Sequence, residues 1–312
     1  MWQLVFSDCL PRDGQNATVA LSRLGNGAAG PTEAATAATV HLAQFVGSGD
    51  AGAAVMALLR RLHGDVCPID GATSARMRTC TTLCDDASGE TTEVVEPWGG
   101  AVSMAEVAAL ATAVTQRVKG LERLDGIAIM GSLPPGVEES LYGELLAMVA
   151  ALPAFWQGHG RKTRVLVDSC TGLAGLLGSG HVGMLKVNGK EAVTAAYGSA
   201  TARRMLDGGG GGDHVGDEMG IAGAATMLLA RYPALEWVAV TDGPGAALLF
   251  GRGGLPAASA SGRTSSPVRK GDFANPIGAG DTVAAVTLHS WSRGALAADA
   301  FRAGLAAGCA SC

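Results

Sequence analysis

Short apolar runs alternate along this chain with longer stretches in which apolar residues recur every three or four positions. The runs predict strands and the longer stretches predict helices, because these spacings match the side-chain periods of the two structures. Strands are expected at 40–46, 76–83, 91–95, 127–130, 164–167, 184–187, 237–241 and 247–250. Helices are expected at 15–24, 51–63, 103–118, 138–151, 217–231, 279–293 and 296–312, and a polar loop at 252–268.

This repeated alternation predicts an α/β fold. The sheet should be mostly parallel and covered by helices on both faces, which gives three layers, α/β/α. A segment of turn composition joins 76–83 to 91–95, so we expect these strands to form a small β lid within a single domain spanning 1–312. Ligands of such sheets bind beyond the carboxyl ends of the strands, where the polar segments after 130, 168, 187 and 241 should lie.

Composition narrows the class of protein. Of 312 residues, 48% are hydrophobic and 16% are charged, which excludes a disordered chain. The net charge is −5, so no basic surface predicts a nucleic-acid partner. No apolar run is long enough to cross a membrane, and the start lacks the basic region of a signal peptide. Seven scattered cysteines are typical of a reducing compartment, so we expect the cytoplasm, or an organelle if an N-terminal segment is missing.

The clearest candidate for chemistry is Gly278-Ala279-Gly280-Asp281, which leads into a predicted helix. Two glycines let backbone amides approach an anion closely, and the helix start adds the positive end of its dipole. The segment therefore suits a phosphoryl group, with an ionised Asp281 that would accept a proton from an attacking hydroxyl. The alternative is an ordinary helix start in which Asp281 is only a first-turn carboxylate.

Two further segments follow predicted strands. Asn188 and Glu191 lie one helical turn apart, so their side chains would face the same way and hold water on Mg²⁺. The alternative there is a helix cap with an exposed glutamate. The segment Thr241-Asp-Gly243 would bring a hydroxyl and close backbone to a nucleotide, or would be a hairpin turn only.

A fourth segment, Gly47-Ser-Gly49-Asp-Ala-Gly52, has the glycine spacing of a dinucleotide-binding turn between a strand and a helix. Asp65 or Asp70 would be the acidic residue of such a unit, but no convincing strand ends at Asp65. The segment keeps an NAD-dependent oxidoreductase among the candidate functions.

Taken in order along the chain, these motifs are similar to those of one family. They are Gly14-Gln-Asn16, Gly131-Ser-Leu-Pro-Pro-Gly136, Asp168, Asn188-x-x-Glu191, Thr241-Asp-Gly243 and Gly278-Ala-Gly-Asp281. The ordered set, from about residue 14 to 312, resembles the ribokinase-like (PfkB) carbohydrate kinase family. The segments 131–136 and 275–281 are most similar to its phosphofructokinase and tagatose-phosphate kinase branch.

The resemblance implies a ribokinase-like fold and transfer of the γ-phosphoryl group of ATP to a hydroxyl of a sugar or sugar phosphate, with a hexose favoured. Asp281 would be the catalytic base, and the amides of Gly278, Ala279 and Gly280 the anion hole. Asn188 and Glu191 would organise Mg²⁺, with a monovalent cation such as K⁺ as a further cofactor. The lid would pair two copies as a homodimer. Nucleotide contacts would come from Asn188, Glu191, Thr241, Gly243 and Lys186, and substrate contacts from Gly14, Asn16 and Asp168.

The chain departs from the family pattern near both ends. Family members carry a strand and a substrate-binding aspartate ahead of the Asn16 motif and continue past the final helix. We therefore expect both termini to be truncated and the first strand of the sheet to be missing. An incomplete acceptor site would leave a non-catalytic nucleotide-binding relative with a regulatory or scaffolding role, which stays open as the alternative beside the oxidoreductase.

Overall fold

A large, mostly parallel sheet forms the middle layer of the molecule. The computed structural model describes residues 2–7, 20, 39–62, 66–69, 71–84, 91–156, 162–200, 202–203, 218–241, 246–252, 256–261 and 278–311. The strands of the sheet are β1 (Trp2–Ser7), β2 (Thr39–Gln44), β4 (Val66–Ile69), β8 (Gly126–Met130), β9 (Arg164–Asp168), β10 (Met184–Asn188), β11 (Trp237–Thr241), β12 (Ala246–Gly251) and β13 (Pro256–Ser261). Their spatial order is β13-β12-β11-β10-β9-β8-β1-β2-β4. Neighbours from β4 to β11 are parallel, and β12 and β13 add antiparallel pairs at one edge.

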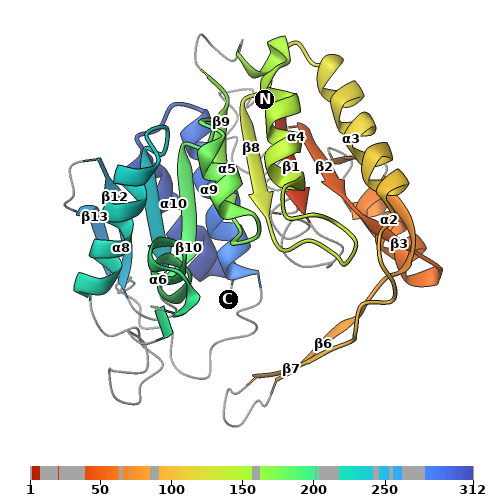
Figure 1. Cartoon of the computed structure of the whole chain (residues 1–312), viewed down its shortest axis with the longest axis horizontal. Helices are drawn as coiled ribbons and strands as arrows, with labels where there is room; N and C mark the ends of the chain where they lie inside the picture. Colours follow the sequence, from red (N-terminus) through yellow and green to blue (C-terminus); the bar gives the residue numbers. More distant parts are fainter. Residues whose placement is uncertain are drawn as a thin grey trace, which may run out of the picture.

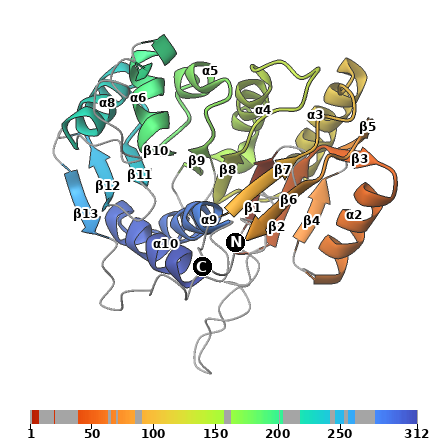
Figure 2. The same ribbon diagram turned by 90° about the horizontal axis from the view of Figure 1, so that it is seen from below.

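Helices cover both faces of this sheet (Figure 2). One face carries α2 (Asp50–Leu62), α9 (Ala279–Ser292) and α10 (Ala297–Ser311). The other carries α3 (Met104–Lys119), α4 (Leu141–Ala150), the 3-10 turn η1 (Pro153–Phe155), α5 (Leu173–Gly178), α6 (Gly189–Tyr197) and α8 (Glu218–Arg231). The expected three-layer α/β/α fold is confirmed. Within the described ranges, no helix combines the length and the apolar character needed to cross a bilayer.

Alternate residues of each strand fill the two faces. In β8, Ile127 and Ile129 pack with the helices from α3 to α8, whereas Ala128 and Met130 pack on the α9 side. All four are fully buried, as expected for a parallel strand that is covered on both faces. Small residues such as Ala128 and Ala284 let α9 lie close to the sheet.

A hairpin projects beyond the carboxyl ends of the parallel strands (Figure 1). It consists of β6 (Cys80–Cys84) and β7 (Thr91–Val95), which pair antiparallel in a sheet of their own. The preceding strand, β5 (Ala72–Arg76), pairs with β3 (Val46–Ser48) in another small sheet. The predicted hairpin is present, and its first strand begins at Cys80 rather than at 76.

The β6–β7 hairpin is the predicted lid, and the segment that leads into it from β5 is its root. One carboxylate, that of Glu106, connects β5 at this root to the start of α3. Ser103 and Glu106 form the predicted capping box, with Glu106 Oε2 accepting a hydrogen bond from Ser103 N at 2.7 Å. The other oxygen, Oε1, accepts from Ser74 N in β5 at 2.6 Å. These hydrogen bonds lower the pKa of Glu106 to about 2. The residue that caps the helix therefore also fixes the strand that leads into the lid.

The expected loss of the first strand is wrong. β1 lies inside the sheet, between β8 and β2, with Gln3 opposite both Gly126 and Val40. A run of this length is too short for periodicity to distinguish a buried strand from an irregular segment. Pairing with two distant strands decides its structure.

Other differences from the sequence expectation lie at weakly patterned segments. β13 falls within the expected polar loop at 252–268, and no strand was expected at β4. β13 is built of small residues and lies at a sheet edge, where pairing on one side is enough to hold a strand. α4 begins at Leu141 rather than at 138. The helix expected at 15–24 lies outside the described residues except for Ala20, which is helical.

Two buried histidines predict how stability depends on pH. Burial, with a smaller effect of the Arg117 charge, lowers the pKa of His41 in β2 from 6.5 to about 4. Burial, with the Arg293 charge, lowers the pKa of His289 in α9 to about 4 as well. Because each pKa is lower in the folded state, the unfolded chain takes up protons first, and stability is lost as the pH falls from 6.5 towards 4. Each histidine should therefore make the free energy of unfolding about 2 kcal/mol smaller at pH 5 than at pH 7.5.

Urea unfolding at pH 7.5 and at pH 5 measures this loss. In a His41→Leu variant, which keeps an apolar side chain in the strand, the difference between the two pH values should shrink by about 2 kcal/mol. An unchanged difference would contradict the burial of a neutral His41.

Candidate functional site

Several predicted site residues lie at the carboxyl ends of neighbouring strands, and therefore on one side of the sheet. Asp168 closes β9, opposite Met130 at the end of β8. Asn188 and Thr241 are register partners at the ends of β10 and β11. The lid projects on this side of the sheet (Figure 1). The parallel topology thus brings together residues that are far apart in the sequence, as the carboxyl-end rule predicts.

A buried ion pair joins β9 and β10 near their carboxyl ends. Nζ of Lys186 donates to Oδ2 of Asp168 at 2.7 Å, and only 8% and 16% of the two side chains are exposed. Burial lowers the pKa of Lys186, but the carboxylates of Asp168, Asp281 and Glu191 outweigh it and raise that pKa above its ordinary value. Lys186 is therefore a fixed positive charge among three carboxylates.

The glycine-rich segment begins α9 at the same place. Gly278 is the N-cap, with a φ of 83° that favours glycine, and its carbonyl accepts from Thr282 N at 2.9 Å. A Cβ on Gly280 would lie 3.2 Å from Nζ of Lys186. The first turn of α9, which contains the half-buried Asp281, therefore lies against the buried ammonium group.

Asn188 and Glu191 adopt the helix-cap arrangement at the start of α6. Asn188 Oδ1 accepts from Glu191 N at 2.9 Å, and Glu191 Oε2 accepts from Asn188 N at 2.8 Å. The cap uses only one oxygen of the carboxylate, so it is compatible with holding water around a cation. Within the described ranges, no cluster of three or more His, Cys, Asp or Glu side chains forms a direct metal site.

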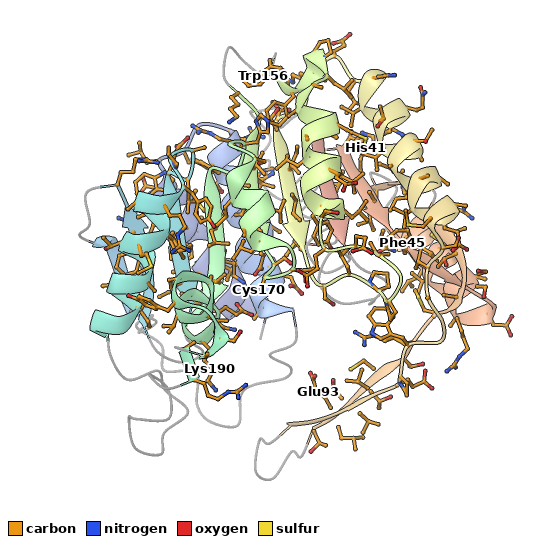
Figure 3. All side chains as sticks on the ribbon, viewed as in Figure 1. His41, Phe45, Glu93, Trp156, Cys170 and Lys190 are labelled. Carbon is orange, nitrogen blue, oxygen red and sulfur yellow. The ribbon has the colours of Figure 1, made fainter. Side chains whose placement is uncertain are left out.

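Cys170 is a further neighbour of the site, beyond the residues that the sequence motifs predict. It lies two residues after the end of β9, on the lid side of the sheet (Figure 3). Partial burial, with the carboxylates of Glu191 and Asp168, raises the pKa of its thiol to about 12. A raised pKa lowers the fraction of thiolate at neutral pH, which makes this thiol a poorer nucleophile than an ordinary cysteine. Its place two residues after a strand end was the available signal.

The glycines at 47–52 have a packing role. A Cβ on Gly52 in α2 would meet the carbonyl oxygen of Gly47, and a Cβ on Gly47 would meet the backbone of Met77, which leads into the lid. The strand before the turn, β3, also lies in a small sheet with β5 rather than in the central sheet. Close packing of α2, β3 and the root of the lid thus accounts for glycine at both positions.

An arginine at the root of the lid is held by an aromatic ring. Arg78 lies between β5 and β6, and its guanidinium carbon is 3.8 Å from the centroid of the Trp98 ring. Nε of Arg78 is buried and has no hydrogen-bond partner in the part of the chain that the structure describes. No pattern in the sequence predicts a role for Arg78, because a single arginine near a turn has no distinctive spacing.

Three predicted site residues, Gly14, Asn16 and Gly243, lie outside the described residues. The others gather at the carboxyl edge of the sheet. These are Asp168, Lys186, Asn188, Glu191, Thr241 and the segment 278–281.

Comparison with known families decides between the candidate classes. A family model described as pfkB family carbohydrate kinase matches residues 13–312. The chain belongs to the pfkB family of carbohydrate kinases. This confirms the resemblance seen in the ordered motifs and leaves the oxidoreductase hypothesis without support. A search of curated proteins finds no match.

Solved structures share the fold of this pfkB-family chain. Phosphofructokinase-2 from Escherichia coli in its tetrameric inhibited form is 20% identical, with a TM-score of 0.68 over 98% of this chain and 93% of that chain. The same enzyme in complex with substrates and products is 20% identical, with a TM-score of 0.68 over 99% and 91%. A possible 1-phosphofructokinase from Thermotoga maritima is 16% identical, with a TM-score of 0.66 over 98% and 90%. These likenesses establish the ribokinase-like fold.

Proposed function

We propose that this pfkB-family protein transfers the γ-phosphoryl group of ATP to a hydroxyl of a sugar or sugar phosphate. The observation that carries the proposal is the buried Lys186 ammonium against the first turn of α9, beside Asp281. Phosphoryl transfer depends mainly on positioning and on stabilising charge at the phosphoryl oxygens. A fixed cation, a helix N-terminus and a carboxylate base supply those needs.

In this mechanism Asp281 accepts the proton of the attacking hydroxyl as its oxygen bonds to phosphorus. The bond between phosphorus and the β,γ-bridging oxygen breaks, and ADP leaves with its electron pair. The amides of Gly278, Ala279 and Gly280 donate to the phosphoryl oxygens, and Lys186 supplies positive charge. Because the base and the amides belong to one helical turn, the hydroxyl and the phosphoryl group are held in a fixed relation.

The residues fit a water-mediated Mg²⁺ site. Mg²⁺ keeps several waters and takes few carboxylates, and Glu191 with Asn188 offers that kind of donor set. When bound, the ion would offset the charge of the nucleotide phosphates. Thr241 and Gly243 would contact the nucleotide. A structure of Escherichia coli phosphofructokinase-2 in complex with potassium supports a monovalent cation as a second ion.

The acceptor would lie between this edge of the sheet and the lid, with Gly14 and Asn16 contributing by resemblance. Arg78, a cation with an unsatisfied buried donor at the root of the lid, favours an acceptor that carries a phosphate. A phosphorylated hexose is therefore our preferred acceptor. Similar structures support it, since one holds fructose 6-phosphate.

Replacing Arg78 with methionine tests this preference. A hydrogen bond to a charged group contributes about 1.5–3 kcal/mol, so the KM for fructose 6-phosphate should rise about 10- to 100-fold. The KM for unphosphorylated fructose should stay the same. Arg76→Met, which removes a mostly exposed arginine from the same region, should change neither value. An equal rise for both sugars in Arg78→Met would remove Arg78 from phosphate recognition.

The proposed reaction is tested by ADP release from Mg-ATP with fructose, fructose 6-phosphate, tagatose 6-phosphate, ribose and adenosine. Acceptor-dependent release would establish the kinase and its substrate class. ATP binding without release would favour the non-catalytic relative. The strand thought to be missing is present as β1, which removes one of the observations behind that alternative.

The lid is our candidate surface for a homodimer. Leu83 in β6 and Val94 in β7 are 56% and 55% exposed, and an isolated two-stranded hairpin is marginally stable in water. The inhibited form of Escherichia coli phosphofructokinase-2 is described as tetrameric, which supports assembly. Sedimentation of the wild type and of a Leu83→Lys variant would test this assembly. We keep the cytoplasm as the proposed compartment.

A further inference from the structure

The contact between Lys186 and Asp168 points to a role for Asp168 other than substrate binding. We propose that Asp168 is a positioning residue, whose carboxylate holds the Lys186 ammonium so that its other N–H bonds reach the phosphoryl group in transfer. The inference rests on the proposed kinase function, and it replaces the substrate contact that the resemblance implies for Asp168.

Because Asp168 and Lys186 are buried together, each charge depends on the other as its partner. Their strands, β9 and β10, are parallel neighbours, and both side chains are largely removed from solvent. A buried charge that loses its partner is strongly unfavourable. The carboxylate of Asp168 accepts a hydrogen bond from the Lys186 ammonium at 2.7 Å. A sugar hydroxyl that competed for this carboxylate would weaken the contact on which the ammonium depends.

A second observation is that the Lys186 ammonium lies next to Gly280 in the first turn of α9. Nζ lies 3.2 Å from the position that a Cβ on Gly280 would take, so it lies against the first turn of the helix. The free N–H groups of a helix N-terminus are donors, and they carry the positive end of the helix dipole. They cannot accept a hydrogen bond from an ammonium. Two sets of donors this close are best satisfied together when an anion binds to both.

Donors of this kind, an ammonium and a helix N-terminus, suit a phosphoryl group. Asp281 belongs to the same turn of α9, so an anion held by Lys186 and this turn lies beside the proposed base. An ammonium has three N–H donors, of which Asp168 takes one and thereby orients the other two. Without Asp168 the flexible lysine would keep its charge but lose its direction.

The test is a double-mutant cycle between Asp168→Asn and Lys186→Met in the full chain. Asparagine keeps the shape of the carboxylate, and methionine keeps much of the apolar stem of lysine. Each single variant should lower kcat by about 10²-fold, as for the loss of one group that stabilises transition-state charge, with little change in the acceptor KM. In the Lys186→Met background, Asp168→Asn should change kcat by less than about twofold.

Two further variants keep the result specific. Glu236→Gln removes the carboxylate of another inter-strand ion pair, Arg164–Glu236 at 3.5 Å, and should keep wild-type kcat. Asp168→Glu restores a carboxylate and should recover part of the kcat lost in Asp168→Asn. Thermal melts establish that each variant is folded. If Asp168→Asn does not fold, Asp168→Glu takes its place in the cycle.

The kinetic outcomes separate the roles of Asp168. Losses in kcat that multiply in the double variant overturn the inference. A rise in acceptor KM that persists without Lys186 also overturns it, because Asp168 would then contact the acceptor directly.

A wild type without turnover on any acceptor would contradict the proposed function, and calorimetry would then decide the inference. The β,γ-imido analogue of ATP should bind more weakly to Asp168→Asn and to Lys186→Met than to the wild type, while ADP binds equally to all three. Equal binding of the analogue, absent binding, or a parallel loss of ADP binding would overturn the role of the pair.

Discussion

Replacing Asp281 with asparagine should remove phosphoryl transfer while leaving the fold and nucleotide binding in place. Asparagine has nearly the same size but cannot accept the proton of the attacking hydroxyl, so kcat should fall by about 10²- to 10⁴-fold. Affinity for ATP should be kept or improved, because one of the three carboxylates around Lys186 loses its charge. The free energy of unfolding should change by less than about 1 kcal/mol, the usual contribution of a first-turn carboxylate.

The measurements are ADP release with the best acceptor, calorimetric ATP binding and thermal unfolding. Asp299→Asn is the matched control, because Asp299 lies in the first turn of α10, where it is exposed and paired with Arg302. The control should lose the same small helix contribution and keep kcat. Full turnover in Asp281→Asn would exclude Asp281 as the base. Equal losses in both variants would indicate a general effect of helix-start carboxylates.

The fold could be predicted where local pattern and tertiary structure agree. The capping box of Ser103 and Glu106 marks the start of α3 by hydrogen bonds within one turn, so sequence alone locates it. β1 is different, because its place between β8 and β2 depends on pairing with Gly126 and Val40, far along the chain. β13 likewise has small residues and no strand pattern, and it is held by its antiparallel pairing with β12.

In the site, too, some features follow from local sequence pattern and others depend on contacts between distant segments. Strand ends predicted that Asp168, Asn188 and Thr241 share an edge, because parallel strands end on one side. No spacing rule predicts that Lys186 pairs with Asp168 or that it lies against Gly280. Those contacts depend on how β10 lies beside β9 and on how closely α9 approaches the sheet. The dinucleotide-like glycines show the converse, since Gly47 and Gly52 match a binding pattern through packing alone.

Gly280 should be the position where one added methyl group lowers activity without lowering stability. A Cβ there would lie 3.2 Å from Nζ of Lys186, so the ammonium must move by a few tenths of an ångström. Lys186 cannot retreat freely, because it is buried and bound to Asp168. Displacement of a positioning group by about 1 Å costs about 10²-fold in rate, so Gly280→Ala should lower kcat by about tenfold or more.

The same change should leave the fold intact or stabilise it. Gly280 lies in the first turn of α9, where alanine fits the helix backbone and should be favoured over glycine by at most about 1 kcal/mol, the value for a helix interior. Gly175→Ala in α5 is the matched control, because a Cβ there would meet nothing within 4 Å, and it should keep kcat. Thermal unfolding and kcat of the two variants decide the point.

Wild-type kcat in Gly280→Ala would mean that catalysis does not depend on the position of the Lys186 ammonium. A loss of stability with the loss of kcat would mean that the methyl group disturbs α9 itself. Lower kcat at undiminished stability would place the effect in the contact between α9 and Lys186, which joins the glycine-rich turn to the ion pair of the sheet.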